Sequence, residues 1–252
     1  MDLPGHMTSL ITALTAANPN TVLVMQSGTP VTLSPFLSTT PALVHAWYGG
    51  NETGNAIASV LFGETNPSAK LPLSWPKRLE DNPSYLNFRS ERGRTLYGED
   101  VYVGYRWYET AKREVEFAFG HGLSYSKFSF GELKVEEANG DVVVSLDVKN
   151  EGAVAGAEVV QVYVAQEKPS IKRPVKELKG FEKVFLEAGE TKRVEVKVQL
   201  KYAASFWDEA RSAWIVEKGK YNVFASDSSK LVEGHYLEGA FEVAKTSWWN
   251  GI

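Results

Sequence analysis

Glu52 is the side chain whose position best suits chemistry. It follows an apolar run and the Gly49-Gly50 turn, and it stands at the start of an expected helix. The loop after a strand is where open α/β sheets bind ligands, so Glu52 could act as a general acid or as a hydrogen-bond partner of a substrate. Its structural alternative is a first-turn acid that the helix dipole stabilises by roughly 0.3–1 kcal/mol. Position alone favours the structural role.

The other carboxylates and the imidazoles form no convincing group. Glu99 and Asp100 are adjacent, and neighbours on an extended chain point in opposite directions. Glycoside hydrolysis needs two carboxylates that face each other across about 5–10 Å, and no such pair can be nominated. The histidines are far apart without an i,i+4 pair, so their spacing does not indicate a metal site. They are His6, His45, His121 and His235, of which His45 is expected in or near a core.

Composition excludes several classes of protein. The 252 residues carry a net charge of −4 and no basic block, which argues against nucleic acid and anionic membranes as partners. No apolar run is long enough to span a bilayer, and the first residues lack a signal peptide pattern, so we expect a cytoplasmic protein. Cysteine is absent, which excludes disulfides and thiolate metal sites. No motif indicates a cofactor, and the sequon at Asn51 is interpreted as a helix start.

The first 63 residues alternate between helical and strand patterns. Residues 6–17 have apolar positions at helical spacing, and Thr21–Met25 is a short β-branched run. An irregular segment leads to a second expected strand at Ala42–Trp47. A helix then follows, with Asn51 as its N-cap and Gly63 at its end. This alternation is typical of a parallel sheet with helices.

Two parallel strands do not make a stable sheet, because parallel sheets need both faces covered. Lys70–Trp75 could add a third strand, but Pro72 would confine it to an edge. We therefore expect a partial α/β sandwich whose other strands come from upstream or from a partner chain. An isolated chain with unpaired strands at residues 21–26 or 42–47 should be prone to aggregation.

Residues 64–120 have the pattern of extended linking structure, punctuated by prolines. The stretch 97–108 is dense in tyrosine and tryptophan and has neither a helical nor a strict strand period. Such aromatic residues suit a seam between domains, where one end of the ring is dry and the other is wet. A platform on which sugars stack is the alternative.

From residue 128 onward, apolar and polar residues alternate with a period of two. Examples are 142–148, 160–164, 194–200, 221–225 and 241–243, separated by turn residues. About seven such strands indicate an immunoglobulin-like or fibronectin type III-like β-sandwich. The expected domains are 1–76 for the partial α/β sandwich, 77–127 for an aromatic-rich linker, and 128–252 for the β-sandwich.

Several long blocks resemble the C-terminal half of glycoside hydrolase family 3 β-glucosidases, and most of all fungal, often intracellular members. These blocks are NPNTVLVMQSGTPV, WYGGNETGNAIASVLFGETNPSAKLPLSWP, YGEDVYVGYRWY, FAFGHGLSYSKF and RPVKELKGFEKVFLEAGE. The resemblance covers essentially the whole chain. It implies an N-terminal barrel, an α/β sandwich and a fibronectin type III-like domain, and retaining hydrolysis of β-glucosides in carbohydrate metabolism or polysaccharide degradation.

The catalytic motifs of that family have no match here. The family's nucleophile is an Asp in a Ser-Asp-Trp setting, whereas Ser226-Asp227-Ser228 is expected to be a turn in the β-domain. The acid/base Glu belongs to a Glu-Gly-Tyr-like loop that comes shortly before an Asp-Leu-Pro-Gly segment, and this chain begins at that segment. The resemblance therefore implies that both carboxylates lie upstream of Met1. No catalytic, cofactor-binding or metal-binding residue is assigned, Glu52 included.

Three functions remain open on the sequence. The first is the C-terminal fragment of a retaining β-glucosidase, inactive alone, that would meet β-glucosides or cello-oligosaccharides only when joined to its barrel. The second is a stand-alone carbohydrate-binding or interaction module that uses the aromatic residues Trp207, Trp214, Trp248 or Trp249. The third is a non-catalytic subunit of a split glucosidase. A homo-oligomer or a missing N-terminal domain is the expected kind of protein partner.

Overall fold

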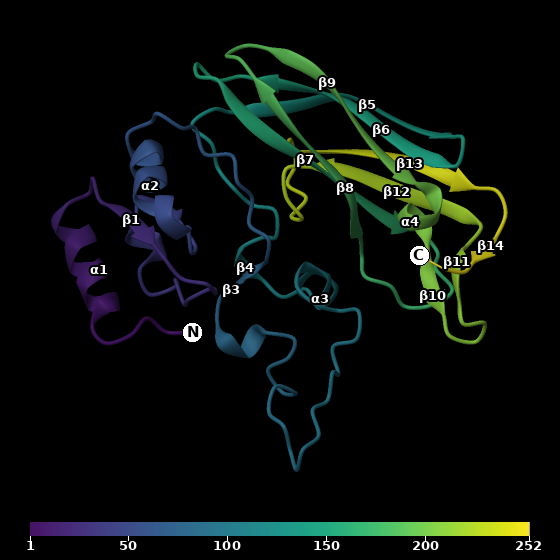
Figure 1. The fold of residues 1–252 in the computed structure, drawn as a ribbon, viewed down its shortest axis with the longest axis horizontal. Coiled ribbons are helices and arrows are strands. Elements are labelled where there is room, and N and C mark those ends of the chain that lie inside the picture. Colours follow the sequence, from purple (N-terminus) through teal and green to yellow (C-terminus); the bar gives the residue numbers. More distant parts are fainter. Residues whose placement is uncertain (252) are drawn as a thin grey trace. The chain divides into compact units, whose positions relative to one another are not determined.

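The computed structural model describes residues 1–251 and divides the chain into two compact units (Figure 1). The first unit contains Met1–Thr65 and Leu73–Phe117. The second unit contains Asn66–Pro72, which we call the strap, and the chain from Ala118 onward. No helix within residues 1–251 is long and apolar enough to cross a membrane.

The first unit is built around two parallel strands, as the sequence predicts. Helix α1 (Met7–Ala17) precedes β1 (Val22–Met25), and β2 (Ala42–His45) is followed by helix α2 (Thr53–Leu61). The strands pair from Val22 opposite Ala42 to Met25 opposite His45. Within residues 1–251 this sheet has no third strand, because β3 (Trp75–Pro76) pairs with β4 (Val115–Phe117) in a separate antiparallel ribbon.

The turn before α2 differs from the expected one. A short 3₁₀ helix, η2 (Gly50–Glu52), precedes α2, so the N-cap is Glu52 and the prediction of Asn51 was wrong. The Glu52 side chain makes no capping hydrogen bond; instead, the Thr53 hydroxyl donates to the Gly50 carbonyl at 2.7 Å. Gly63 has φ +77°, a left-handed conformation typical of a helix end, as predicted.

The aromatic segment contains a helix that its pattern did not predict. Short 3₁₀ turns η1 (Leu37–Thr39) and η3 (Leu79–Asp81) come before it, and α3 (Tyr105–Thr110) begins after Gly104, whose φ is +57°. Only six residues long, α3 is too short to show a clear period. Its Tyr108 is buried, and burial raises the pKa of that phenol to about 12.

The second unit contains the predicted β-sandwich. One sheet has the order β13-β12-β7-β8 and the other has the order β5-β6-β9, all neighbours being antiparallel. Their bounds are β5 Phe128–Ala138, β6 Asp141–Asn150, β7 Gly156–Gln166, β8 Glu177–Leu186, β9 Thr191–Gln199, β12 Gly219–Ser226 and β13 Tyr236–Val243. Alternate residues of β6, such as Val144 and Leu146, are fully buried in a core that both sheets share.

A third, smaller sheet completes this unit. It has the order β10-β11-β14, formed by Phe206–Asp208, Ala213–Val216 and Ser247–Trp249. A short helix, α4 (Leu200–Ala204), takes over directly from β9, so Leu200 belongs to a helix and not to the strand that its alternation suggested.

The two units differ in how much apolar surface they bury. The buried apolar residues of the first unit are Met25, Leu33, Phe36, Trp75 and Tyr108. The apolar stripe of α1 faces solvent instead, with Met7, Leu10 and Leu14 each at least half exposed. Helix α2 has no buried residue, and Phe62 at its end is 85% exposed. The first unit therefore has the exposed apolar surface of an incomplete domain.

Candidate functional site

The candidate site lies at the carboxyl ends of β1 and β2, the edge at which α/β sheets bind ligands. His45 is the last residue of β2. Its ring makes edge contacts with the rings of Trp47 and Trp75, at centroid distances of 4.2 and 4.9 Å and interplanar angles of 76° and 90°. His45 is therefore a near-core residue, as expected from the sequence.

His45 has unused hydrogen-bonding capacity. Both of its ring nitrogens are buried, and within residues 1–251 neither has a partner. Burial lowers the pKa of His45, so the neutral imidazole, with one donor and one acceptor, is the form that this site favours. A buried polar atom without a partner costs about 1–3 kcal/mol, and such atoms require an explanation in function or in a missing neighbour.

The backbone after His45 is strained. Trp47 has φ +51°, a left-handed conformation that is unusual for a bulky residue, so it lies outside the strand predicted to reach it. The loop also passes close to the loop after β1, since a Cβ added to Gly28 would collide with the Tyr48 ring. Strained residues of this kind are concentrated at ligand-binding sites, which makes 46–52 the part of the first unit best suited to a ligand.

The predicted candidate carboxylates do not converge at this loop. Glu52 is exposed, and its carboxylate accepts a hydrogen bond from the Asn55 amide at 2.6 Å. Glu99 and Asp100 lie in a turn rather than on the extended chain expected for them, and the Tyr102 amide donates to the Glu99 carbonyl. No group of three or more His, Cys, Asp or Glu residues within 1–251 could hold a metal ion.

Replacing His45 with phenylalanine tests the free-energy cost of burying two ring nitrogens that have no hydrogen-bond partner within residues 1–251. A folded-state pKa below the ordinary histidine value of about 6.5 means that His45 contributes stability above that pH, and that this contribution is lost as the pH falls through the folded pKa. His45→Phe should therefore reduce the loss of stability of the first unit between pH 7 and pH 5. It should also raise stability at pH 7 by about 1 kcal/mol. Thermal unfolding across this pH range measures both effects, and an unchanged pH slope would contradict the first.

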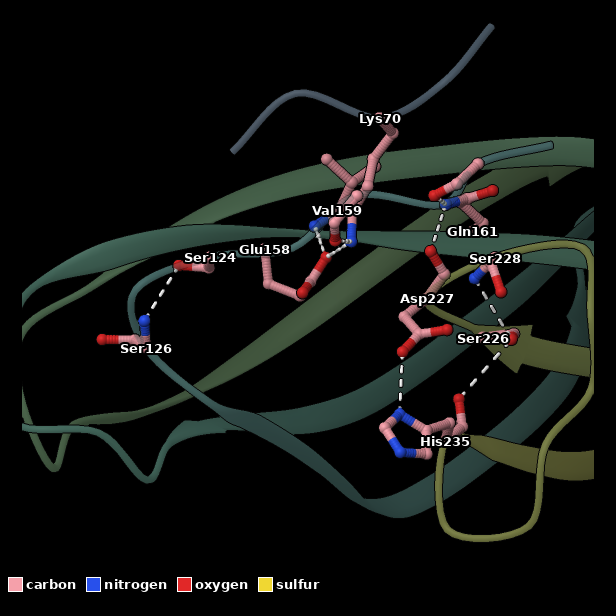
Figure 2. Close-up of polar contacts among 12 residues, drawn as sticks. Lys70, Ser124, Ser126, Glu158, Val159, Gln161, Ser226, Asp227, Ser228 and His235 are labelled. Atoms are coloured by element: carbon pink, nitrogen blue, oxygen red, sulfur yellow. Dashed lines mark hydrogen bonds and ion pairs between the residues drawn. The ribbon is translucent and has the colours of Figure 1, made fainter. Parts of the chain in front are cut away.

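A second polar cluster, in the second unit, was missed by sequence reasoning (Figure 2). The ammonium of Lys70 in the strap lies 2.7 Å from the Glu158 carboxylate on β7 and donates to the Gly122 carbonyl at 3.0 Å. The same Glu158 oxygen accepts the Val159 amide at 2.6 Å. Both side chains are nearly buried, with 13% and 10% of their surface exposed. Burial raises the pKa of Glu158, and Lys70 opposes that shift.

The rest of this cluster fixes the chain around Gly120. Gln161 donates to the carbonyls of Gly120 and Asp227, at 3.1 and 2.6 Å, and accepts from the Tyr163 hydroxyl at 2.7 Å. Asp227 and His235 pair at 2.9 Å in the loop between β12 and β13, where the sequence predicted a turn (Figure 2). Because these groups bind backbone or one another, the cluster positions segments of the chain.

Separation along the chain explains why this cluster could not be predicted. Lys70 and Glu158 are 88 positions apart, and no local spacing connects them. The strap is held by further bonds of the same kind: Asn66 donates to the Ala155 carbonyl at 2.9 Å, and Leu71 donates to the His121 carbonyl at 2.8 Å.

Known proteins match both units. Residues 1–125 match the glycosyl hydrolase family 3 C-terminal domain, and residues 158–229 match a fibronectin type III-like domain. The chain is similar to a probable β-glucosidase I of Aspergillus fumigatus, at 53% identity, and to a putative β-glucosidase of Schizosaccharomyces pombe, at 47% identity. Each match covers all of this chain and 30% of the relative, so the chain spans about a third of the length of these proteins.

Solved structures give the same result. A β-glucosidase from Kluyveromyces marxianus in complex with glucose matches all of this chain and 30% of its own, with a TM-score of 0.95 and 50% identity. β-Glucosidase 3B from Thermotoga neapolitana matches 99% of this chain and 35% of its own, with a TM-score of 0.91 and 33% identity. Both the sequences and the folds agree with the family 3 resemblance. The chain therefore belongs to glycoside hydrolase family 3, of which it carries the C-terminal domain and the fibronectin type III-like domain.

Proposed function

We propose that this chain supplies the C-terminal part of a retaining β-glucosidase, which releases terminal β-D-glucosyl residues only when the chain is joined to a catalytic barrel. Its β-sandwich has a core that its two sheets share. Its first unit would complete an α/β domain, and the loop 46–52 would then lie at the ligand-binding edge of the completed sheet.

The observation that carries this proposal is the unfinished first unit. Its sheet has two strands within residues 1–251, and the apolar stripe Met7, Leu10 and Leu14 of α1 is exposed. An exposed apolar stripe at helical spacing marks a surface that another element covers. The relatives are more than three times as long as the matched segment, so we expect the rest of such an enzyme to cover this apolar surface.

The chemistry of glycoside hydrolysis also supports catalytic groups that lie outside this chain. Acetal hydrolysis with retention needs two carboxyl groups about 5 Å apart, one as nucleophile and one as acid and base. The carboxylates weighed in the first unit, Glu52, Glu99 and Asp100, lie on the helix turn and in the turn at 98–101 and form no such pair. Both reacting groups would then come from the barrel and from the other half of the α/β domain.

Complementation tests the proposal. The 252-residue chain alone should not turn over an aryl β-glucoside. Fused to the N-terminal part of the Kluyveromyces marxianus enzyme, in place of the matching C-terminal part, it should restore hydrolysis that the N-terminal part alone lacks. Turnover by the isolated chain, or a correctly folded but inactive fusion, would contradict the proposal.

A variant of the exposed stripe makes the test specific. Leu10→Asp with Leu14→Asp should change the stability of the isolated chain little, since both side chains face solvent there. In the fusion, the two charges should prevent assembly and abolish activity, because an unpaired charge would be buried. Ser9→Asp, an exposed position on another side of α1, is the matched control and should leave the fusion active.

A further inference from the structure

The tryptophans that the sequence singled out are covered by neighbours within the small sheet. The Trp214 and Trp249 rings stack at a centroid distance of 5.7 Å, and Trp207 contacts the Trp214 ring edge to face at 5.5 Å. The Arg211 guanidinium lies over the Trp248 ring at 4.0 Å. A group of more exposed apolar side chains lies in the first unit, in the segment between η3 and α3.

This segment, residues 82–104, extends from the body of the first unit, and we call it the finger (Figure 1). It contains no helix or strand of its own. Connections of more than about 12–15 residues without secondary structure are uncommon inside compact domains, and those that occur are usually functional or disordered. The contacts within the finger decide between these two possibilities, because they give it a defined hairpin shape.

The tip of the finger is a tight turn. The Glu91 amide donates to the Arg94 carbonyl at 2.9 Å, and the Arg94 amide donates back to the Glu91 carbonyl at 3.0 Å. Between them, Arg92 and Gly93 both have positive φ, +49° and +76°. Two successive residues with positive φ are typical of the two-residue turn whose twist suits a hairpin.

The two arms behind the tip keep the same register. The Ser90 and Thr95 hydroxyls form a hydrogen bond of 2.6 Å. Further along the arms, a Cβ added to Gly98 would lie only 2.6 Å from the Asn87 side-chain nitrogen, so the chain passes close to this amide. The finger is therefore a built hairpin and not a loosely held loop.

Large apolar side chains on this hairpin face solvent. The register of the arms places Phe88 opposite Tyr97, and these side chains are 80% and 84% exposed. Leu86 and Leu96 on the same arms are 90% and 66% exposed. They contribute little to the packing of the first unit. Exposed apolar side chains that are gathered in one place mark a surface to which another protein segment binds.

The polar residues of the finger also suit an interface. Its sequence contains three arginines, Arg89, Arg92 and Arg94, and no lysine. All three are exposed, at or beside the tip. Arginine and aromatic residues are enriched in protein interfaces, whereas lysine is depleted. The arginines give the tip a positive charge in a chain whose net charge is −4, so the tip fits an acidic partner surface.

The base of the finger lies where the rest of a joined enzyme would enter. The Met1 carbonyl accepts a hydrogen bond from the Thr32 amide at 2.9 Å, and the Met1 sulfur accepts one from the Asn82 side chain at 3.7 Å. Consecutive Cα atoms are only about 3.8 Å apart, so polypeptide attached before Met1 starts beside Asn82, the first residue of the finger. The chain matches 30% of its relatives' length, so most of such an enzyme lies outside it.

We propose that the finger is a docking arm that packs against the part of the joined enzyme preceding Met1, which holds the catalytic groups. Phe88 and Tyr97 are its apolar anchors, and the arginines of the tip face an acidic rim on that part. This inference rests on the proposed function, because docking within one molecule needs a joined enzyme. A second copy of this chain is the competing occupant, and the experiment separates the two.

Photo-cross-linking in the fusion with the N-terminal part of the Kluyveromyces marxianus enzyme tests this proposal. p-Benzoylphenylalanine in place of Tyr97 should form bonds to peptides of the N-terminal part of the same molecule, and mass spectrometry of the digested protein identifies them. The same replacement at Phe181, a 65% exposed position on β8, is the matched control. The proposal assigns no partner to Phe181, so few such bonds should form there.

Hydrogen exchange provides an independent measurement. Amides of residues 84–98 should exchange more slowly in the fusion than in the isolated chain, by about tenfold or more, because docking must be broken before they open. Phe88→Ser with Tyr97→Ser should abolish this difference. The same two changes should leave the unfolding temperature of the isolated chain unchanged, since both side chains face solvent there. Phe181→Ser should keep the slower exchange.

Three results would overturn the proposal. They are cross-links that join two copies and none to the N-terminal part, exchange at 84–98 that is equally fast in the fusion, and slower exchange that persists in the Phe88→Ser/Tyr97→Ser variant. All of these readouts report contact and not turnover. A folded fusion that is inactive but cross-links at Tyr97 would therefore reject the proposed function and still support docking.

Discussion

Replacing Lys70 with methionine is expected to destabilise the second unit by about 3–5 kcal/mol, the usual cost of leaving one member of a buried ion pair without its partner. Glu158 would keep its burial and lose the ammonium 2.7 Å away, while the Gly122 carbonyl would lose a donor. Urea unfolding, followed by the fluorescence of the tryptophans of the small sheet, measures the change. A loss near zero would show that water replaces Lys70 easily.

The double variant Lys70→Met/Glu158→Leu separates attraction from burial. Buried ion pairs replaced by apolar residues of similar size are often neutral or stabilising, so most of the loss should be recovered. Lys77→Met is the surface control: its ammonium lies at a similar distance, 2.6 Å, from Glu114, but both groups face solvent. That control should show no measurable change, because exposed pairs are screened by water.

Replacing Trp75 with alanine is the change expected to damage the first unit most. Trp75 is 1% exposed, its indole N–H donates to the Val31 carbonyl at 2.8 Å, and its ring contacts His45. Loss of a buried tryptophan side chain costs about 3–5 kcal/mol, and an unpaired carbonyl adds to that cost. In a unit with so few buried apolar residues, we expect local unfolding.

Hydrogen exchange measures this effect by region. In the Trp75→Ala chain, amides of β1 and β2 should exchange rapidly, while β6 and β12 should keep their protection. Trp248→Ala is the matched control, since that ring is 43% exposed and should be removed at little cost. Loss of protection in β6 as well would show that the two units unfold together and would contradict the expected local effect.

The β-sandwich could be predicted strand by strand because each strand has one wet and one dry face. Alternation at 142–148 and 194–198 appears in the structure as β6 and β9, paired from Asp141 opposite Gln199 to Lys149 opposite Thr191. The short parallel strands could be predicted as well, from β-branched runs between turn residues. Patterns of this kind are local, so sequence alone contains them.

Features that depend on distant neighbours could not be predicted in this way. Trp47 was assigned to a strand because it ends an apolar run, but its φ of +51° takes it out of the strand, and its ring packs against His45. The cap of α2 moved from Asn51 to Glu52 because a 3₁₀ turn takes up the preceding residues. A pocket of the second unit is lined by Asn139, Gln199 and Trp249, which are at least 50 positions apart from one another, and no local pattern marks that combination.

The strap prevents the two units from being separated as consecutive segments of the chain. The polypeptide passes between the two units at 65/66, 72/73 and 117/118, so no single peptide-bond cut separates them. A truncation that begins at Ala118 discards Lys70 and leaves a buried carboxylate behind on β7. The sandwich is therefore not an independent module. A recombination event that transfers it to another gene must also transfer seven residues from well before its first strand, because the fold is weakened without them.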